Sequence, residues 1–155
     1  MKDNFSKIGK EVVQAEINAL KKLKKSINSD FSKIVNSILK CKGKVIFSGV
    51  GKSGIISNKI SSTLSSLGIP SFYVDAGSAS HGDLGMITSN DVLIIISHSG
   101  ETSELKNLIQ YTKRNKNIIL IGITSKKNSL LYKSSNLHFL LPSIIEAGPG
   151  NYIPS

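Results

Sequence analysis

Residues 45–54 read VIFSGVGKSG, a short apolar run that passes directly into a glycine-rich turn. The same order returns at residues 92–102, which read VLIIISHSGET. In both stretches a run of strand length leads into glycine and hydroxyl residues, and apolar residues then recur at helical spacing. A strand that turns into a helix is the first half of a βαβ unit. These two stretches therefore predict an α/β domain with a parallel sheet.

The segments on either side complete the expected sheet. Five apolar runs are expected to be strands, at residues 45–48, 71–74, 92–96, 118–123 and 137–141, with helices at 53–67, 102–115 and 127–134. The third and fourth runs are continuously apolar, which is typical of central strands covered on both faces. Right-handed crossovers favour a doubly wound five-stranded parallel sheet in the flavodoxin-like order 2-1-3-4-5. In that order ligands bind at the carboxyl ends of strands 1 and 3, where both quoted loops are expected.

The first 42 residues have a different pattern, with apolar residues at helical spacing and no strand signal. One helix is expected from about Phe5 to Ile27, and a second follows Ser29-Asp30, which supplies an N-cap. We therefore expect an N-terminal helical segment at residues 1–42, which packs on the domain or on a partner subunit. The ligand-binding domain is expected at residues 43–155.

The composition is that of a globular protein. Of the 155 residues, 39% are hydrophobic and 19% are charged, which is ordinary for one domain. No apolar run approaches the roughly 18 residues that span a bilayer, and the N-terminus lacks the compact apolar core of a signal peptide. Cys41 is the only cysteine, so no intrachain disulfide can form. These features predict a cytoplasmic protein with no membrane partner.

The net charge of +10 at pH 7 raises the question of a nucleic-acid partner. Arg114 is the only arginine among the 20 basic residues, and the chain has no tryptophan. Nucleic-acid readers commonly use arginine for bidentate base contacts and aromatic side chains for stacking. We therefore expect no nucleic-acid partner, while the positive field would help to collect an anionic substrate.

The first loop, at residues 49–54, suits an anion because its glycines expose backbone N–H groups ahead of a helix N-terminus. It also fits the dinucleotide fingerprint G-x-G-x-x-G, since Asp75 follows Gly54 by 21 residues, where a ribose-binding acid would stand. It does not fit the P-loop, because Ile46 occupies the position of that pattern's first glycine. A tight turn without a ligand is the remaining interpretation.

The second loop, at residues 97–102, places three hydroxyl residues and a glycine before a helix. Neutral donors and free N–H groups at a helix N-terminus suit a phosphate monoester. N-capping by Ser99 or Thr102, with Glu101 in the first turn, is the alternative, but capping accounts for only one hydroxyl. A dinucleotide fold does not need this second loop. Two anion-binding loops beside one crevice therefore favour a small phosphorylated ligand.

The loop at residues 78–85, which reads SASHGDLG, holds one of the three histidines. His81 is expected on the crevice side of the sheet and is the histidine candidate for proton transfer, with a cap or packing role as the alternative. His98 is interpreted as a loop residue and His138 as a structural one. No group of residues has convincing metal-ligand spacing, so no metal site is expected.

Four motifs occur in order along the chain: VGKSG at residues 50–54, ASHGDLGM at 79–86, SHSGET at 97–102 and EAGP at 146–149. Together they resemble the sugar isomerase (SIS) domain of arabinose-5-phosphate isomerases, over roughly residues 5–155. The HGDLGM block is specific to that branch, whereas the SHSGET segment at residues 97–102, here called the serine loop, is shared by phosphosugar-binding relatives generally.

The resemblance implies an aldose–ketose isomerase that interconverts D-arabinose 5-phosphate and D-ribulose 5-phosphate through a cis-enediol, without a cofactor. In carbohydrate metabolism this reaction feeds synthesis of the lipopolysaccharide sugar Kdo. Because family members are usually dimers or tetramers, the resemblance also implies a homodimer or homotetramer. It implies catalytic roles for Lys52, His81, Glu101 and Glu146, and substrate binding by Gly51, Ser53, Gly54, Ser97, Ser99, Gly100 and Thr102.

The chain departs from the family pattern near its end. Gly148 stands where the family has cysteine, residues 150–153 diverge, and the family's closing helix and its His-Pro-Gly-Gly segment do not follow. We expect a domain that is incomplete at its C-terminus, either as a truncated gene product or as a piece of a longer protein. Two functions stay open, an isomerase and a phosphosugar-binding module without turnover. An assay for ribulose 5-phosphate distinguishes them.

Overall fold

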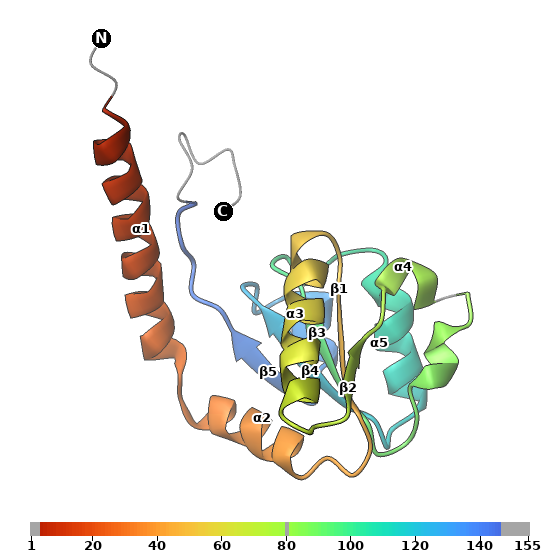
Figure 1. Cartoon of the computed structure of the whole chain (residues 1–155). Helices are drawn as coiled ribbons and strands as arrows, with labels where there is room; N and C mark the ends of the chain where they lie inside the picture. The colour runs from red at the N-terminus through yellow and green to blue at the C-terminus, as the bar shows by residue number, and fades with distance from the viewer. Residues whose placement is uncertain (1–3, 80, 147–155) are drawn as a thin grey trace. The chain divides into compact units, whose positions relative to one another are not determined.

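The computed structural model of the chain describes residues 4–79 and 81–146. The chain divides into two units, one formed by residues 1–28 and 141–155 and the other by Ser29–Leu140. Figure 1 shows the elements of both units. The second unit contains the whole sheet, and with it both loops that the sequence singles out.

The sheet has five parallel strands, and they confirm the predicted order. The strands are β1 (Val45–Gly49), β2 (Ser71–Tyr73), β3 (Val92–Ile96), β4 (Ile119–Thr124) and β5 (Leu137–Leu140). They lie in the order β2-β1-β3-β4-β5 (Figure 1). Gly49, the last residue of β1, pairs with Ile96, the last residue of β3. The loops that leave these two strands therefore start side by side at the carboxyl ends of the strands.

Helices cover both faces of the sheet, which explains why its central strands are apolar on both sides. One core packs α5 (Leu105–Arg114) and α6 (Leu130–Ser134) against the sheet, with Leu93, Ile95 and Leu120 fully buried. The other lies on the opposite face, under α2 (Ser29–Leu39) and α3 (Lys52–Ser66). On that face the rings of Phe31 in α2 and Phe139 in β5 have centroids 5.7 Å apart.

The structure adds two short elements that the sequence did not predict. Between β2 and β3 lie α4 (Ala76–Ala79) and the 3-10 turn η1 (Asp83–Met86). Their glycine, alanine and serine residues carry little periodic signal. The next helix, α5, starts at Leu105 rather than near residue 102, because the residues before it form the serine loop.

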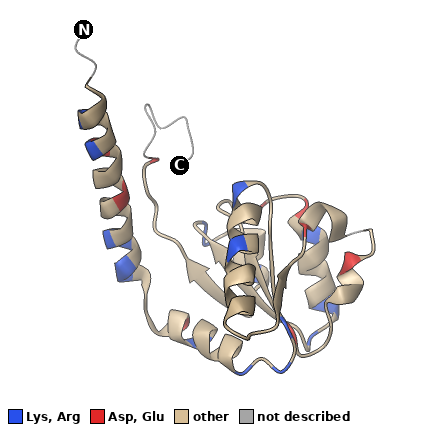
Figure 2. Ribbon diagram, in the orientation of Figure 1, with Lys and Arg blue, Asp and Glu red and all other residues tan. Residues whose placement is uncertain are grey.

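The first unit contains α1 (Phe5–Ser26), a helix of 22 residues with no buried residue. Within the part of the chain that the structure describes, no helix is long and apolar enough to cross a membrane. Basic residues are spread over α1, α2, α3 and α5, as Figure 2 shows for the helices in view.

Candidate functional site

The start of α3 forms the first half of the site. Gly51 precedes the helix with φ +59°, a conformation that favours glycine, and as the N-cap residue it makes no side-chain cap hydrogen bond. The first N–H groups of a helix have no partner within it. A helix start of this kind presents donors to an anion.

Gly54 lets α3 begin close to the sheet. A Cβ atom at this position would lie 2.7 Å from the Tyr73 hydroxyl and 2.8 Å from the Gly49 carbonyl oxygen. That hydroxyl donates to the same carbonyl at 2.9 Å. Burial, followed by the charge of Asp75, raises the Tyr73 pKa above its ordinary value. The phenol therefore stays a neutral donor that fixes the end of β1.

The serine loop after β3 forms the second half of the site. The Ser97 hydroxyl is buried, accepts the Gly100 N–H at 3.0 Å and lies 2.9 Å from the Thr102 hydroxyl oxygen. The exposed Ser99 accepts the Glu101 N–H at 3.2 Å. Ser97 closes the loop from inside, while Ser99 and Glu101 are exposed at the surface. These hydrogen bonds give the loop a defined shape.

Contacts with the end of β4 hold this loop in place. The Ser97 N–H donates to the Ile123 carbonyl at 3.0 Å. The His98 carbonyl accepts the Ser125 N–H at 3.1 Å and the Ser125 hydroxyl at 2.8 Å. Ser125 was not among the expected site residues, because its role depends on the pairing of β3 with β4. His98 is exposed, and its Nε2 lies 3.3 Å from the Ser125 hydroxyl oxygen.

The remaining expected residues have different placements. His81 is exposed after α4, and its N–H donates to the Ser78 carbonyl at 2.9 Å. Lys52 is the exposed first residue of α3. Glu146 belongs to the other unit of the chain, the one formed by residues 1–28 and 141–155. Ser80 and residues 147–149 lie outside the described residues.

Asp75, the ribose-binding acid of the dinucleotide alternative, has a local structural role. Its carboxylate accepts the Ser78 N–H at 2.8 Å and the Ser78 hydroxyl at 3.1 Å. These hydrogen bonds lower the Asp75 pKa. The residue holds the turn of α4, which weakens the dinucleotide interpretation. Residues 4–79 and 81–146 contain no group of three or more histidine, cysteine or acidic residues that could hold a metal ion.

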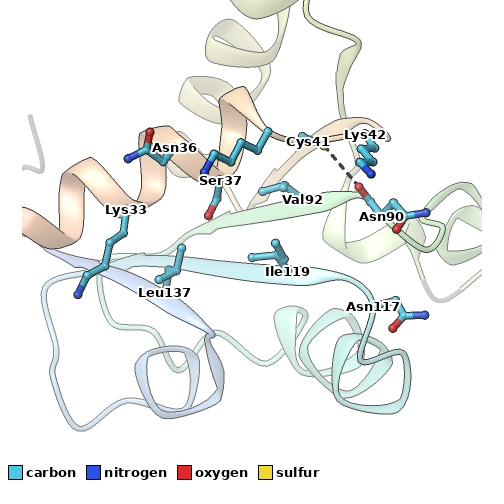
Figure 3. A pocket seen from close by; sticks show the side chains of 11 residues that line it. Lys33, Asn36, Ser37, Cys41, Lys42, Asn90, Val92, Asn117, Ile119 and Leu137 are labelled. Atoms are coloured by element: carbon cyan, nitrogen blue, oxygen red, sulfur yellow. Dashed lines mark hydrogen bonds between the residues drawn. The ribbon is translucent and has the colours of Figure 1, made fainter.

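A separate cavity of about 560 Å³ lies at the amino ends of the strands, opposite the two loops. Figure 3 shows Val92, Ile119 and Leu137 at the sheet, with Lys33 and Asn36 on the helix beside them. In parallel α/β sheets ligands bind at the carboxyl ends of the strands. Together with the donors gathered there, this rule makes the two loops the candidate site.

Comparisons with known proteins agree with this assignment. The SIS domain family matches residues 38–152. The chain is 43% identical to the arabinose 5-phosphate isomerase KdsD of Yersinia pestis, covering 98% of this chain and 46% of that protein. It is 45% identical to an uncharacterised protein of Rickettsia prowazekii, covering 94% of this chain and 45% of that one. The chain thus spans less than half the length of these curated relatives.

Solved structures show the same fold. An Escherichia coli CFT073 protein in complex with arabinose 5-phosphate matches with a TM-score of 0.91 and 36% identity, covering all of this chain and 82% of that one. A sugar-phosphate isomerase described as putative, from Listeria monocytogenes, matches with a TM-score of 0.92 and 30% identity, over 99% of this chain and 80% of that one.

Proposed function

The chain belongs to the SIS domain family, and we propose that it is an aldose–ketose isomerase that interconverts D-arabinose 5-phosphate and D-ribulose 5-phosphate. The observation that carries the proposal is the juxtaposition of the α3 N-terminus, which begins at a glycine N-cap, and the serine loop at the ends of paired strands. The likeness to KdsD of Yersinia pestis, at 43% identity, supports the same sugar phosphate.

The phosphate group of the substrate binds between the two loops. Backbone N–H groups at the start of α3 and the Ser99 hydroxyl supply neutral donors to it. Ser97 contributes indirectly, because its hydroxyl shapes the loop. The remaining expected contacts are those of Gly51, Ser53, Gly54, Gly100 and Thr102.

The reaction moves a proton between C1 and C2 of the sugar through a cis-enediol. It needs a base within hydrogen-bonding reach of that proton and donors that stabilise the enediolate. C1 changes from an aldehyde to an alcohol while C2 changes from an alcohol to a ketone. Because the oxidation of C2 balances the reduction of C1 within one molecule, no redox cofactor takes part. His81 and Glu146 are the acid–base groups of the proposal, and Lys52 stabilises charge near the reacting carbons. In the cell the reaction belongs to cytoplasmic carbohydrate metabolism that supplies lipopolysaccharide synthesis.

The protein acts as a homodimer or homotetramer. The support is α1, on which Val13, Ile17 and Leu20 share one side of the helix and are each at least 40% exposed. A helix with such a face in the N-terminal segment, residues 1–42, suits packing against a second copy. An oligomer would also let neighbouring subunits supply residues to one another's sites.

A turnover assay tests the proposed reaction. Purified protein is given D-arabinose 5-phosphate, and ribulose 5-phosphate is measured by a coupled reaction. We expect turnover with the phosphorylated sugar and none with free arabinose, since the two loops recognise the phosphate. Stabilisation by arabinose 5-phosphate without turnover would favour the phosphosugar-binding module instead. A larger thermal shift with NAD than with the sugar phosphate would contradict both.

A further inference from the structure

The carboxylate of Glu101 is hydrogen-bonded to the start of α6. Its Oε1 accepts the Leu130 N–H at 2.7 Å, a length typical of hydrogen bonds to a charged acceptor. Leu130 is the first residue of α6, so its N–H has no partner within that helix. The bond joins residues 29 positions apart in the chain. It therefore ties the serine loop to a separate element.

Two more bonds complete the junction. The Leu131 N–H donates to the Gly100 carbonyl at 3.0 Å, and the Tyr132 N–H donates to the Ser129 hydroxyl at 3.3 Å. Three successive N–H groups of α6 are thus satisfied, two of them by the serine loop. Gly100 is buried, and a Cβ atom there would lie 2.6 Å from the Ser129 Cβ. The loop and the helix start fit closely together.

We propose that Glu101 is a positioning residue, which holds the serine loop on α6 in the shape that binds phosphate, and that it does not transfer the substrate proton. The inference rests on the proposed function of this loop as the phosphate site. One carboxylate oxygen is already engaged, and its partner is a backbone group that does not change protonation. Proton transfer then belongs to other groups of the site.

Two substitutions distinguish a role of Glu101 in holding the loop from a role in proton transfer. In Glu101→Gln the amide oxygen still accepts the Leu130 N–H, but the side chain is no longer a base. Glu101→Ala removes both properties. Glu104→Gln is the matched control, because this exposed acid sits three residues further along and bonds the Ser103 hydroxyl at 2.7 Å rather than α6.

The expected result is that Glu101→Gln keeps kcat within about tenfold, with an unchanged pH profile. Glu101→Ala should raise both KM and the Kd for inorganic phosphate by about tenfold, which corresponds to one lost hydrogen bond. A proton-transfer role predicts the reverse, with kcat of Glu101→Gln falling by about 10²–10⁴ while the phosphate Kd stays constant. That result would overturn the inference.

Amide hydrogen exchange at Leu130 gives a readout that needs no turnover. Protection should persist in Glu101→Gln and Glu104→Gln and fall in Glu101→Ala, while the melting curve shows that each variant folds. If the wild type binds phosphate but has no isomerase activity, the proposed reaction fails, while exchange and phosphate Kd still decide the positioning role. Unchanged exchange and phosphate Kd in Glu101→Ala would contradict it.

Discussion

Ser97 and Ser99 stand two residues apart in one motif, yet the fold uses their hydroxyls differently. The Ser97 side chain is buried and closes the loop through the Gly100 N–H, whereas Ser99 is exposed. The motif predicted the residue types that suit a phosphate. It could not predict which hydroxyl faces inward, because that depends on how the loop meets β4 and α6.

Gly100 is the residue at which the loop tolerates least change. Its φ is +65°, and a Cβ atom would overlap the Ser129 hydroxyl oxygen and lie 2.9 Å from the Thr124 hydroxyl oxygen. Gly100→Ala should lower the free energy of unfolding by about 1–2 kcal/mol for the backbone conformation and by about 1–3 kcal/mol more for overpacking. It should also weaken phosphosugar binding. Urea denaturation and calorimetric titration measure the two effects.

Gly68→Ala is the control for the backbone conformation alone. Gly68 has φ +83°, but an added Cβ atom would meet nothing within 4 Å among the described residues beyond its chain neighbours. This variant should lose only the backbone part of the stability and keep the affinity for the sugar phosphate. Equal losses in the two variants would show that the loop does not fit tightly against Ser129.

At the scale of elements, a buried carboxylate joins the starts of β1 and β3. Asp91 accepts the Lys44 and Thr88 N–H groups, both at 2.7 Å, and its side chain is fully buried. Burial acts to raise its pKa, but the hydrogen bonds from Thr88 and Lys44 outweigh this, so the pKa lies below its ordinary value. Protonation in acid must therefore work against folding.

A lowered pKa fixes the sign of the pH dependence. The stability that Asp91 contributes is present above the unfolded-state pKa of about 3.9 and is lost as the pH falls through the lower folded-state pKa. Urea denaturation between pH 7 and pH 3 should show this loss in the wild type. Asp91→Asn should be less stable at pH 7 and lose less on acidification. Glu16→Gln, which changes an exposed carboxylate, is the control and should lose as much stability in acid as the wild type. If Asp91→Asn also loses as much stability as the wild type, the acid sensitivity belongs to other groups.

A second prediction at the scale of elements concerns the exposed apolar face of α1 and the oligomeric state. Ile17 and Leu20 lie on one side of the helix and are 40% and 63% exposed. If this face joins subunits, Ile17→Glu with Leu20→Glu should reduce the molar mass measured by light scattering to that of a monomer. Lys22→Glu, also on α1, should leave the oligomer intact. A wild type that is itself monomeric would contradict the proposed oligomer.

The sequence predicted the regular elements better than the contacts between them. All five strands and their order followed from apolar run length and the crossover rule. The helix α4 did not, because its short glycine- and serine-containing stretch has no periodicity to read. The two loops were proposed as a site from their glycine and hydroxyl residues, and their role in binding stays a prediction. The bond from Leu130 to Glu101 was not, since only the folded sheet brings α6 beside the serine loop.

At the scale of the whole molecule, the strand order brings the two halves of the candidate site together. Placing β3 beside β1 brings together two loops that lie more than 40 residues apart in sequence, and both loops follow the carboxyl ends of their strands. The cavity at the amino ends of the strands, which Lys40 and Lys42 help to line, provides a second place where an anion could bind. The carboxyl ends and the amino ends of the strands are therefore two distinct candidate locations for the same ligand.

The most direct measurement is a titration of ¹⁵N-labelled protein with D-arabinose 5-phosphate, followed by two-dimensional NMR. We expect the largest shifts at the amides of residues 51–54 and 99–102, saturating with the sugar phosphate and absent with free arabinose. Gly100→Ala should diminish them. Shifts confined to Lys40, Lys42 and Asn117, or none at either loop, would contradict the assignment of the phosphosugar site to the carboxyl ends of β1 and β3.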